Sequence, residues 1–157
     1  MDLPFDILYE DNHLIAVNKP VNLLVQGDAT GDPVLLELVR EYIRVKYNKP
    51  GNVFLGVTHR LDRPVSGVVL LAKTGKALSR VNERFRKKEV RKIYWAIVRN
   101  CPDPAEGRLV HHLLKNRQQN KSYPVPPGTP AAKEAVLSYR LAGRSESFFL
   151  LEVELET

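Results

Sequence analysis

Residues that build disulfide, redox and metal centres are scarce in this sequence. Its 157 residues include one cysteine, Cys101, one methionine and one tryptophan. A single cysteine excludes an internal disulfide and fits a reducing compartment. Two of the four histidines, His111 and His112, are adjacent in an expected strand and would point to opposite faces, which is poor geometry for one metal ion. We therefore expect no metal site.

Long apolar runs are also absent. No stretch approaches the roughly 18 residues that a membrane-spanning helix needs. The N-terminal stretch MDLPFDILYED is acidic and lacks the basic, apolar start of a signal peptide. With 43% hydrophobic and 27% charged residues, the composition is that of an ordinary globular protein. We expect a cytoplasmic protein with no membrane partner and a single domain that spans residues 1–157.

Negative charge is scarce in one particular segment. The formal net charge is +6, yet residues 1–58 carry five Lys/Arg against eight Asp/Glu, whereas residues 76–99 carry nine Lys/Arg against two Asp/Glu. A basic stripe on one helix and the strand after it is typical of proteins that bind a phosphate backbone. The alternative, a solvated helix face, is common for charge runs.

The hydrophobic pattern predicts an α+β fold with a mainly antiparallel sheet and two principal helices. Residues 34–47 repeat apolar side chains three and four positions apart, with Asp32 as the candidate N-cap and Pro33 at the first helical position. A second helix is expected over residues 75–88. Strands are expected in a hairpin that ends at Pro20 and in residues 53–57, 67–72, 90–98, 107–114, 134–141 and 147–156.

Two further expectations concern the second half of the chain. Residues 115–130 are polar and carry four prolines, which predicts a long or partly disordered loop. Trp95 alternates with Tyr94 along its strand, so it should point the opposite way and into the core. The last strand is still alternating at Glu156 when the sequence stops, which indicates a C-terminally truncated fragment.

The most informative stretch is THRLDRPVSG, residues 58–67, which leads into an apolar strand. Its acid, Asp62, stands between Arg60 and Arg63, and two nearby cations favour the ionised form and lower the pKa of a carboxyl. Such a carboxylate suits a nucleophile or an anion that stabilises positive charge better than a general acid. Pro64 stiffens the loop just after the acid. The alternative is an ordinary loop ion pair.

The residues of this motif also carry a family resemblance. HRLDRPVSGVVLLAKT resembles the signature of the RluA-type pseudouridine synthases, ILYEDNHLIAVNKP resembles their opening hairpin, and KKEVRKIYWAIV resembles the strand that carries their active-site tyrosine. The three stretches occur in the family's order and cover the chain from about Ile7 to its end. The resemblance implies the pseudouridine-synthase catalytic fold, a mainly antiparallel mixed sheet with flanking helices.

The resemblance also implies an activity and a set of roles. The reaction would convert specific uridines of ribosomal or transfer RNA to pseudouridine, without a cofactor because it is an isomerisation. Asp62 would be the catalytic aspartate, Tyr94 would lie against the target base, and Arg60 would fill the space left by the flipped nucleotide. His59 and Arg63 are further expected RNA-binding residues. Phosphate contacts are expected on the basic helix and just after it, from Arg80, Arg84, Lys87 and Arg91.

Departures from the family pattern leave alternatives open. Asn22-Leu23 stands where Gly-Leu is common, and Val65 where Thr is common. The family's C-terminal arginine segment would begin where this sequence ends, so the activity of the 157-residue chain itself is in question. One alternative is a non-catalytic RNA-binding protein with the same fold, and another is a basic protein-interaction domain. We expect a monomer.

Overall fold

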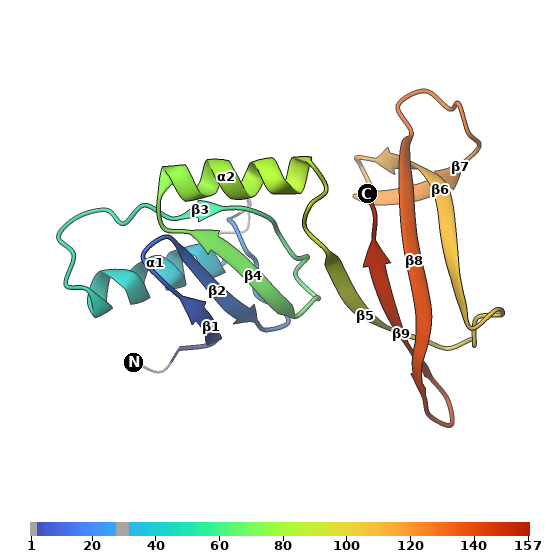
Figure 1. Cartoon of the computed structure of the whole chain (residues 1–157), viewed down its shortest axis with the longest axis horizontal. Helices are drawn as coiled ribbons and strands as arrows, with labels where there is room; N and C mark the ends of the chain where they lie inside the picture. Colours follow the sequence, from blue (N-terminus) through green and yellow to red (C-terminus); the bar gives the residue numbers. More distant parts are fainter. Residues whose placement is uncertain (1–2, 28–31) are drawn as a thin grey trace. The chain divides into compact units, whose positions relative to one another are not determined.

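The computed structural model describes residues 3–27 and 32–157. The chain divides between Arg86 and Lys87 into two compact units, a first unit up to Arg86 and a second unit Lys87–Thr157. Figure 1 shows both helices in the first unit and an all-β second unit. Each unit has its own antiparallel sheet, so the predicted α+β class with a mainly antiparallel sheet is confirmed. That the two units form one domain stays a prediction.

The first unit is built on a four-stranded sheet in the order β1-β2-β4-β3. The strands are β1 (Asp6–Glu10), β2 (Leu14–Lys19), β3 (Gly56–Val57) and β4 (Gly67–Ala72). The predicted hairpin joins β1 to β2. Its turn is held by Asp11, whose Oδ1 accepts hydrogen bonds from the backbone N–H groups of His13 at 2.7 Å and Leu14 at 2.6 Å. A short acidic side chain that bonds the backbone two and three residues ahead explains the turn at this position.

One face of this sheet forms the core with the helix α1 (Leu35–Lys46). Alternate residues of the two central strands, among them Ile15 and Leu71, are fully buried together with Val39 and Ile43 of the helix. The apolar face that repeats every two residues in the strands therefore packs against the apolar face that repeats every 3.6 residues in the helix. Lys19 has the same parity as Ile15 and is also fully buried, at the end of β2.

The start of α1 differs from the prediction. Val34 is the N-cap, without a side-chain cap bond, and the helix begins at Leu35. The first N–H groups are bonded instead by backbone carbonyls of the preceding loop, from Leu35 N–H to Leu24 O at 2.8 Å and from Leu36 N–H to Val25 O at 3.2 Å. Because tertiary contacts satisfy these donors, Asp32 is not needed as a cap, and the expectation for it was wrong.

The helix α2 (Gly75–Arg86) follows β4 after a two-residue turn and runs alongside β3 and β4 (Figure 1). The Thr74 hydroxyl accepts a hydrogen bond from the Ala77 N–H at 3.2 Å, which caps the first turn. Leu78 lies against Gly56, where an added Cβ would stand 2.7 Å from the leucine side chain. The close approach of helix and strand thus depends on a glycine.

The second unit is a five-stranded antiparallel sheet in the order β5-β9-β8-β6-β7. Its strands are β5 (Lys92–Val98), β6 (Glu106–Asn116), β7 (Lys121–Val125), β8 (Lys133–Arg144) and β9 (Phe149–Leu155). The predicted loop over residues 115–130 was partly wrong, because β6 and β7 form a hairpin there. The Asn116 side chain accepts hydrogen bonds from the N–H groups of Gln118 and Gln119 and so organises the turn. Pro124 is tolerated because β7 is an edge strand.

The two faces of β5 differ in chemistry. Tyr94 pairs with Val153 of β9, on a half-buried apolar face, whereas Trp95 pairs with Glu152 on the opposite face. The expected alternation is therefore present, but Trp95 is 75% exposed and Ile97 is 74% exposed. The expectation that Trp95 enters the core was wrong, since no element of the described second unit covers that face of β5.

Candidate active site

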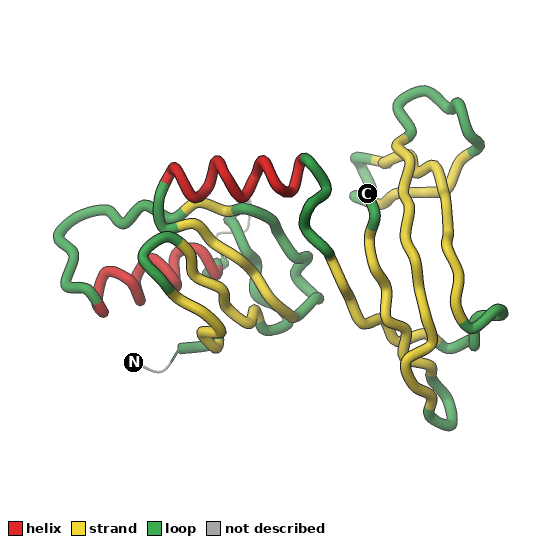
Figure 2. The backbone as a smooth tube through the Cα atoms, in the orientation of Figure 1, coloured by secondary structure: helices red, strands yellow, loops and turns green. Residues whose placement is uncertain are grey.

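The HRLDRPVS segment is the loop that joins β3 to β4 in the first unit, drawn as loop in Figure 2. Asp62 is exposed near its middle, and the Val65 N–H donates to the Asp62 carbonyl at 3.0 Å, which closes a tight turn. Leu61, one residue earlier, is partly buried against the core of the unit. The exposed carboxylate of Asp62 thus follows directly after a leucine that packs against the core.

The entry to this loop is held by side chains that continue the strand ladder. The Thr58 hydroxyl donates to the Leu70 carbonyl at 2.6 Å, and the Leu70 N–H donates to Nε2 of His59 at 3.1 Å. The His59 ring also packs on Phe85 of α2, with centroids 5.3 Å apart. Burial lowers the pKa of His59, which favours the neutral imidazole that this acceptor role requires. His59 therefore fixes the start of the loop.

Lys19 holds the centre of the Asp62 loop in place from the end of β2. Its buried ammonium donates to three backbone carbonyls, those of Pro20 at 3.0 Å, Leu23 at 2.8 Å and Arg63 at 3.3 Å. The Arg63 carbonyl also accepts the Asn22 N–H at 2.8 Å. Three donors meet three acceptors, so the buried charge is fully hydrogen-bonded.

Lys19 also interacts electrostatically with Asp62, the candidate catalytic carboxylate. Burial lowers the pKa of Lys19, and the negative charge of Asp62 opposes that effect, with a net lowering. Burying an ammonium is costly unless an anion or several carbonyls compensate. Here the anion is Asp62, and the carbonyls belong to the loop around Asp62 and to the segment after β2. The Asn-Lys-Pro motif is therefore part of the support of the Asp62 loop.

The arginines on either side of Asp62 have different surroundings. Both are exposed, but the Arg63 guanidinium pairs with Asp32 at 2.9 Å, near the start of α1. The sequence led us to expect both cations beside Asp62, whereas Arg63 is drawn toward a different carboxylate. Such a surface pair contributes on the order of 0–1 kcal/mol.

The end of the loop depends on Gly67, which has φ of +135°. L-amino acids with a side chain rarely adopt this backbone conformation, whereas glycine does so at little cost. Gly67 is also the first residue of β4, paired with Lys19 in the sheet. The turn from the Asp62 loop into the strand is therefore set by a glycine opposite the buried lysine.

The remaining predicted site residues belong to two groups. Arg80 and Arg84 lie on α2, and Lys87 follows it as the first residue of the second unit. Arg91 makes a two-pronged ion pair with Glu154 in the second unit, at 2.9 and 2.8 Å. Tyr94 lies on β5 of the same unit, so Asp62 and Tyr94 are described in separate units.

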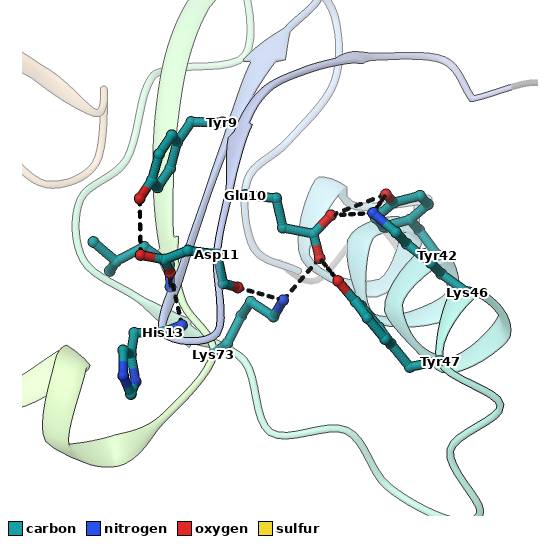
Figure 3. A network of polar contacts seen from close by, with 9 residues as sticks. Tyr9, Glu10, Asp11, His13, Tyr42, Lys46, Tyr47 and Lys73 are labelled. Atoms are coloured by element: carbon teal, nitrogen blue, oxygen red, sulfur yellow. Dashed lines mark hydrogen bonds and ion pairs between the residues drawn. The ribbon is translucent and has the colours of Figure 1, made fainter.

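A second polar cluster joins β1, α1 and β4 in the first unit (Figure 3). The Glu10 carboxylate accepts hydrogen bonds from Lys46 at 2.7 Å, Lys73 at 2.7 Å, Tyr47 at 2.8 Å and Tyr42 at 3.0 Å. Burial raises the pKa of Glu10, but these four donors outweigh it and lower the pKa to about 2. Lys73, near the end of the HRLDRPVSGVVLLAKT stretch, therefore has a structural role through its bond to Glu10.

Sequence reasoning missed the roles of Lys19 and Glu10. A signal for Lys19 was present, because it continues the buried parity of Ile15 and Val17 to the end of β2. A charged residue at such a position needs buried partners. No comparable signal marks Glu10, whose partners come from two distant segments, residues 42–47 and Lys73. Residues 3–27 and 32–157 contain no cluster of three metal-ligating side chains, and neither helix described is long and apolar enough to cross a membrane.

Comparison with known proteins identifies close sequence relatives. The family model described as RNA pseudouridylate synthase matches residues 13–157. An uncharacterized RNA pseudouridine synthase of Synechocystis sp. is 31% identical over 157 residues, 99% of this chain and 48% of that protein. Ribosomal large subunit pseudouridine synthase D of Xylella fastidiosa is 32% identical over 159 residues, 99% of this chain and 45% of that protein. The chain spans about half the length of these curated relatives.

Solved structures show the same relationship. The human protein titled RNA Pseudouridylate Synthase Domain Containing 4 matches with a TM-score of 0.81 and 26% identity, over 97% of this chain and 59% of that chain. The human protein titled RNA Pseudouridylate Synthase Domain Containing 1 shares the fold with a TM-score of 0.75 at 18% identity. By sequence and by fold, this chain belongs to the RNA pseudouridylate synthase family, in its RluA-type group.

Proposed function

We propose that the protein to which this chain belongs isomerises specific uridines of RNA to pseudouridine, with Asp62 as the catalytic carboxylate. The observation that carries the proposal is an exposed Asp62 on a loop held by Lys19 through the Arg63 carbonyl and by His59 through the Leu70 N–H. An acid that must meet a sugar or base needs to be accessible, and catalysis needs it held in one place. This loop supports both requirements.

In the proposed reaction, the glycosidic bond between ribose C1′ and uracil N1 breaks while the base remains bound. The base rotates, a bond forms between C1′ and C5, the hydrogen of C5 leaves as a proton, and N1 gains a proton in place of its broken bond to C1′. The Asp62 carboxylate acts as a nucleophile toward the substrate or stabilises the positive charge that develops on the sugar. No electrons are gained or lost overall, so the step requires no redox cofactor.

The other residues would take supporting roles. A base in a helix must leave the stack before its glycosidic bond is reached, at a cost of a few kcal/mol. Arg60, exposed beside Asp62, would fill the gap, and Tyr94 would supply an aromatic face for the flipped base. His59 and Arg63 would act mainly by holding the loop, since each has a partner within the first unit.

The basic residues of α2 and its C-terminal end would bind phosphates. Arg80 and Arg84 are one turn apart on the helix, which supports contacts to neighbouring phosphates. Lys87 would add a further phosphate contact from the start of the second unit. A phosphate contact from Arg91 would compete with its ion pair to Glu154.

The RNA class follows from the relatives only as a proposal. Several relatives are named ribosomal large subunit pseudouridine synthases, which makes large-subunit ribosomal RNA the first substrate to test and transfer RNA the second. The alternative function, RNA binding without catalysis, predicts salt-sensitive binding without turnover. A cytoplasmic location and a monomeric state remain predictions.

The test measures tritium release from RNA labelled at uridine C5, with RNA from a strain that lacks the gene. The protein is prepared in two forms, as the 157-residue chain and as the full product of its natural reading frame. Asp62→Asn should abolish release by the active form, because the carboxylate is lost with little change in shape. Glu146→Gln removes one exposed negative charge from a surface turn and should leave release unchanged. Release that survives Asp62→Asn would overturn the assignment, and salt-sensitive RNA binding without release would favour the binding-only alternative.

A further inference from the structure

A pocket lies at the far end of the β2–β4 pair from the Asp62 loop. It has a volume of about 320 Å³ and is lined by Asp11 and His13 of the β1–β2 turn, by Leu14 of β2, and by Lys76, Arg80 and Val81 of α2. All of these residues belong to the first unit. The volume is at the small end of the roughly 300–1,000 Å³ range of ligand pockets and would admit a group the size of one nucleotide.

The lining combines an apolar floor with basic side chains. Leu14, Val81 and the buried Ala77 supply the floor. Lys76 and Arg80 are four residues apart on α2, so they lie on the same side of the helix, one turn from each other. A sugar or base against the floor and a phosphate against the two cations would match this chemistry.

The charges at the pocket favour an anion. Asp11 is the acid of the lining, but its carboxylate already accepts hydrogen bonds from the His13 and Leu14 N–H groups and from the Tyr9 hydroxyl. Lys76 and Arg80 are exposed, and neither has an ion-pair partner within residues 3–27 and 32–157. Two cations without a local carboxylate partner are available to phosphates.

The position of the pocket relates it to Asp62. Leu14 pairs with Ala72 at one end of the β2–β4 ladder, and Lys19 pairs with Gly67 at the other end, where the Asp62 loop begins β4. Five strand steps separate the two ends, about 17 Å. Helix α2 runs between the pocket and the entry to the loop, because its first two turns line the pocket while Phe85, near its end, contacts His59.

From this geometry we propose that the α2 pocket, formed by His13, Leu14, Lys76, Arg80 and Val81, binds a phosphate and the adjoining sugar or base of an RNA nucleotide that flanks the target uridine. The proposal rests on the proposed function for its RNA substrate. It adds a second contact point at the opposite end of the β2–β4 ladder from the Asp62 loop, about 17 Å away along the strands. The pocket would thereby contribute to affinity and target choice and leave the chemical step unchanged.

The test is RNA binding by the protein in its natural reading frame, with an unmodified transcript of large-subunit ribosomal RNA as the probe. Dissociation constants are measured from 50 to 300 mM KCl for wild type and for the double variant Lys76→Gln/Arg80→Gln. Loss of two phosphate contacts should weaken binding roughly tenfold at low salt and reduce the slope of log Kd against log salt by about 1.5 to 2.

Two controls make the result specific. Arg44→Gln/Lys49→Gln removes the same number and kind of charges from the end of α1 and the turn after it, and it should change the slope little. Lys76→Arg/Arg80→Lys keeps both charges and should keep the slope. Crosslinking of photoreactive 4-thiouridine transcripts to residues 13–14 or 76–81 should occur in wild type and be lost in the neutral variant.

The outcomes separate this inference from the proposed reaction. If the neutral variant binds RNA with the same affinity and slope as wild type, the pocket inference is wrong. It is also wrong if the variant loses binding to poly-glutamate, tested in parallel, but retains binding to RNA, since the pocket would then suit an acidic protein segment. If wild type releases no tritium yet binds RNA with a slope that the variant reduces, the reaction proposal fails and the pocket inference stands.

Discussion

The Nζ atom of Lys19 lies 3.3 Å from the carbonyl oxygen of Arg63, the residue after Asp62. The two residues are 44 positions apart in the chain, and the same carbonyl accepts the N–H of Asn22. One backbone oxygen thus joins the segment after β2 to the loop that carries the candidate catalytic acid. A buried ammonium is well suited to this task, because it offers three donors and attracts the nearby carboxylate.

Replacing Lys19 by Met should destabilise the first unit. The carbonyls of Pro20 and Leu23 would lose this donor in a buried setting, at a cost of about 2 kcal/mol in the free energy of unfolding. Urea unfolding measures the change, and Lys49→Met at an exposed position should cost less than about 0.5 kcal/mol. A Lys19→Met protein as stable as wild type would show that the three hydrogen bonds are not needed to hold the loop.

The Glu10 cluster predicts an acid-labile fold. The pKa of Glu10 is lowered from 4.5 to about 2 in the folded state, so its contribution is fully present above pH 4.5 and is lost as the pH falls toward 2. The shift corresponds to at most about 3 kcal/mol. Thermal unfolding between pH 7 and pH 3 should show a falling Tm in wild type. Glu10→Gln should be less stable at pH 7 and should show a smaller fall. Parallel curves for the two proteins would contradict this role.

Gly67 should not tolerate a side chain. Gly67→Ala places an L-residue at φ of +135°, with an expected loss of about 1–3 kcal/mol in the free energy of unfolding. Gly75→Ala at the first position of α2 is the matched control, since an added Cβ there meets no atom within 4 Å. The control should be neutral or slightly stabilising. Equal effects of the two substitutions in chemical denaturation would refute the argument from backbone conformation.

Trp95 should behave as a surface residue of this chain. It is the only tryptophan, so its fluorescence reports one site. Because Trp95 is 75% exposed, its emission should be close to that of the unfolded chain, and iodide should quench it with similar efficiency before and after unfolding. Trp95→Ala should cost less than about 1 kcal/mol, whereas a buried tryptophan costs about 3–5 kcal/mol. Blue-shifted emission with little quenching would show that Trp95 is buried.

Local patterns in the sequence were sufficient for much of the fold. Period-two and period-3.6 repeats of apolar residues predicted both helices and most strands, because these repeats reflect which face of a single element is buried. The HRLDRPVSG motif identified the loop of Asp62 for a similar reason. Its glycine and proline act on the backbone within a few residues. Its resemblance to a known family is visible in the amino-acid sequence alone.

The features that local patterns did not predict depend on distant segments. The backbone of residues 24–25 caps α1 in place of Asp32, and the second unit leaves Trp95 uncovered. Residues 121–125 became a strand despite Pro124, because pairing with β6 at the sheet edge satisfies the remaining backbone groups. In each case a contact across the chain replaced the partner that local chemistry suggested.

The sequence by itself determined the alternation that buries Lys19, the acid between two arginines at Asp62 and the glycine at position 67. The tertiary structure alone decided that the Lys19 ammonium meets the Arg63 carbonyl, that four donors surround Glu10, and that α2 spans from the pocket to His59. The physical reason is that propensity and periodicity act over a few residues. Hydrogen bonds between segments 40 or 60 residues apart exist only once packing of the core has brought those segments together.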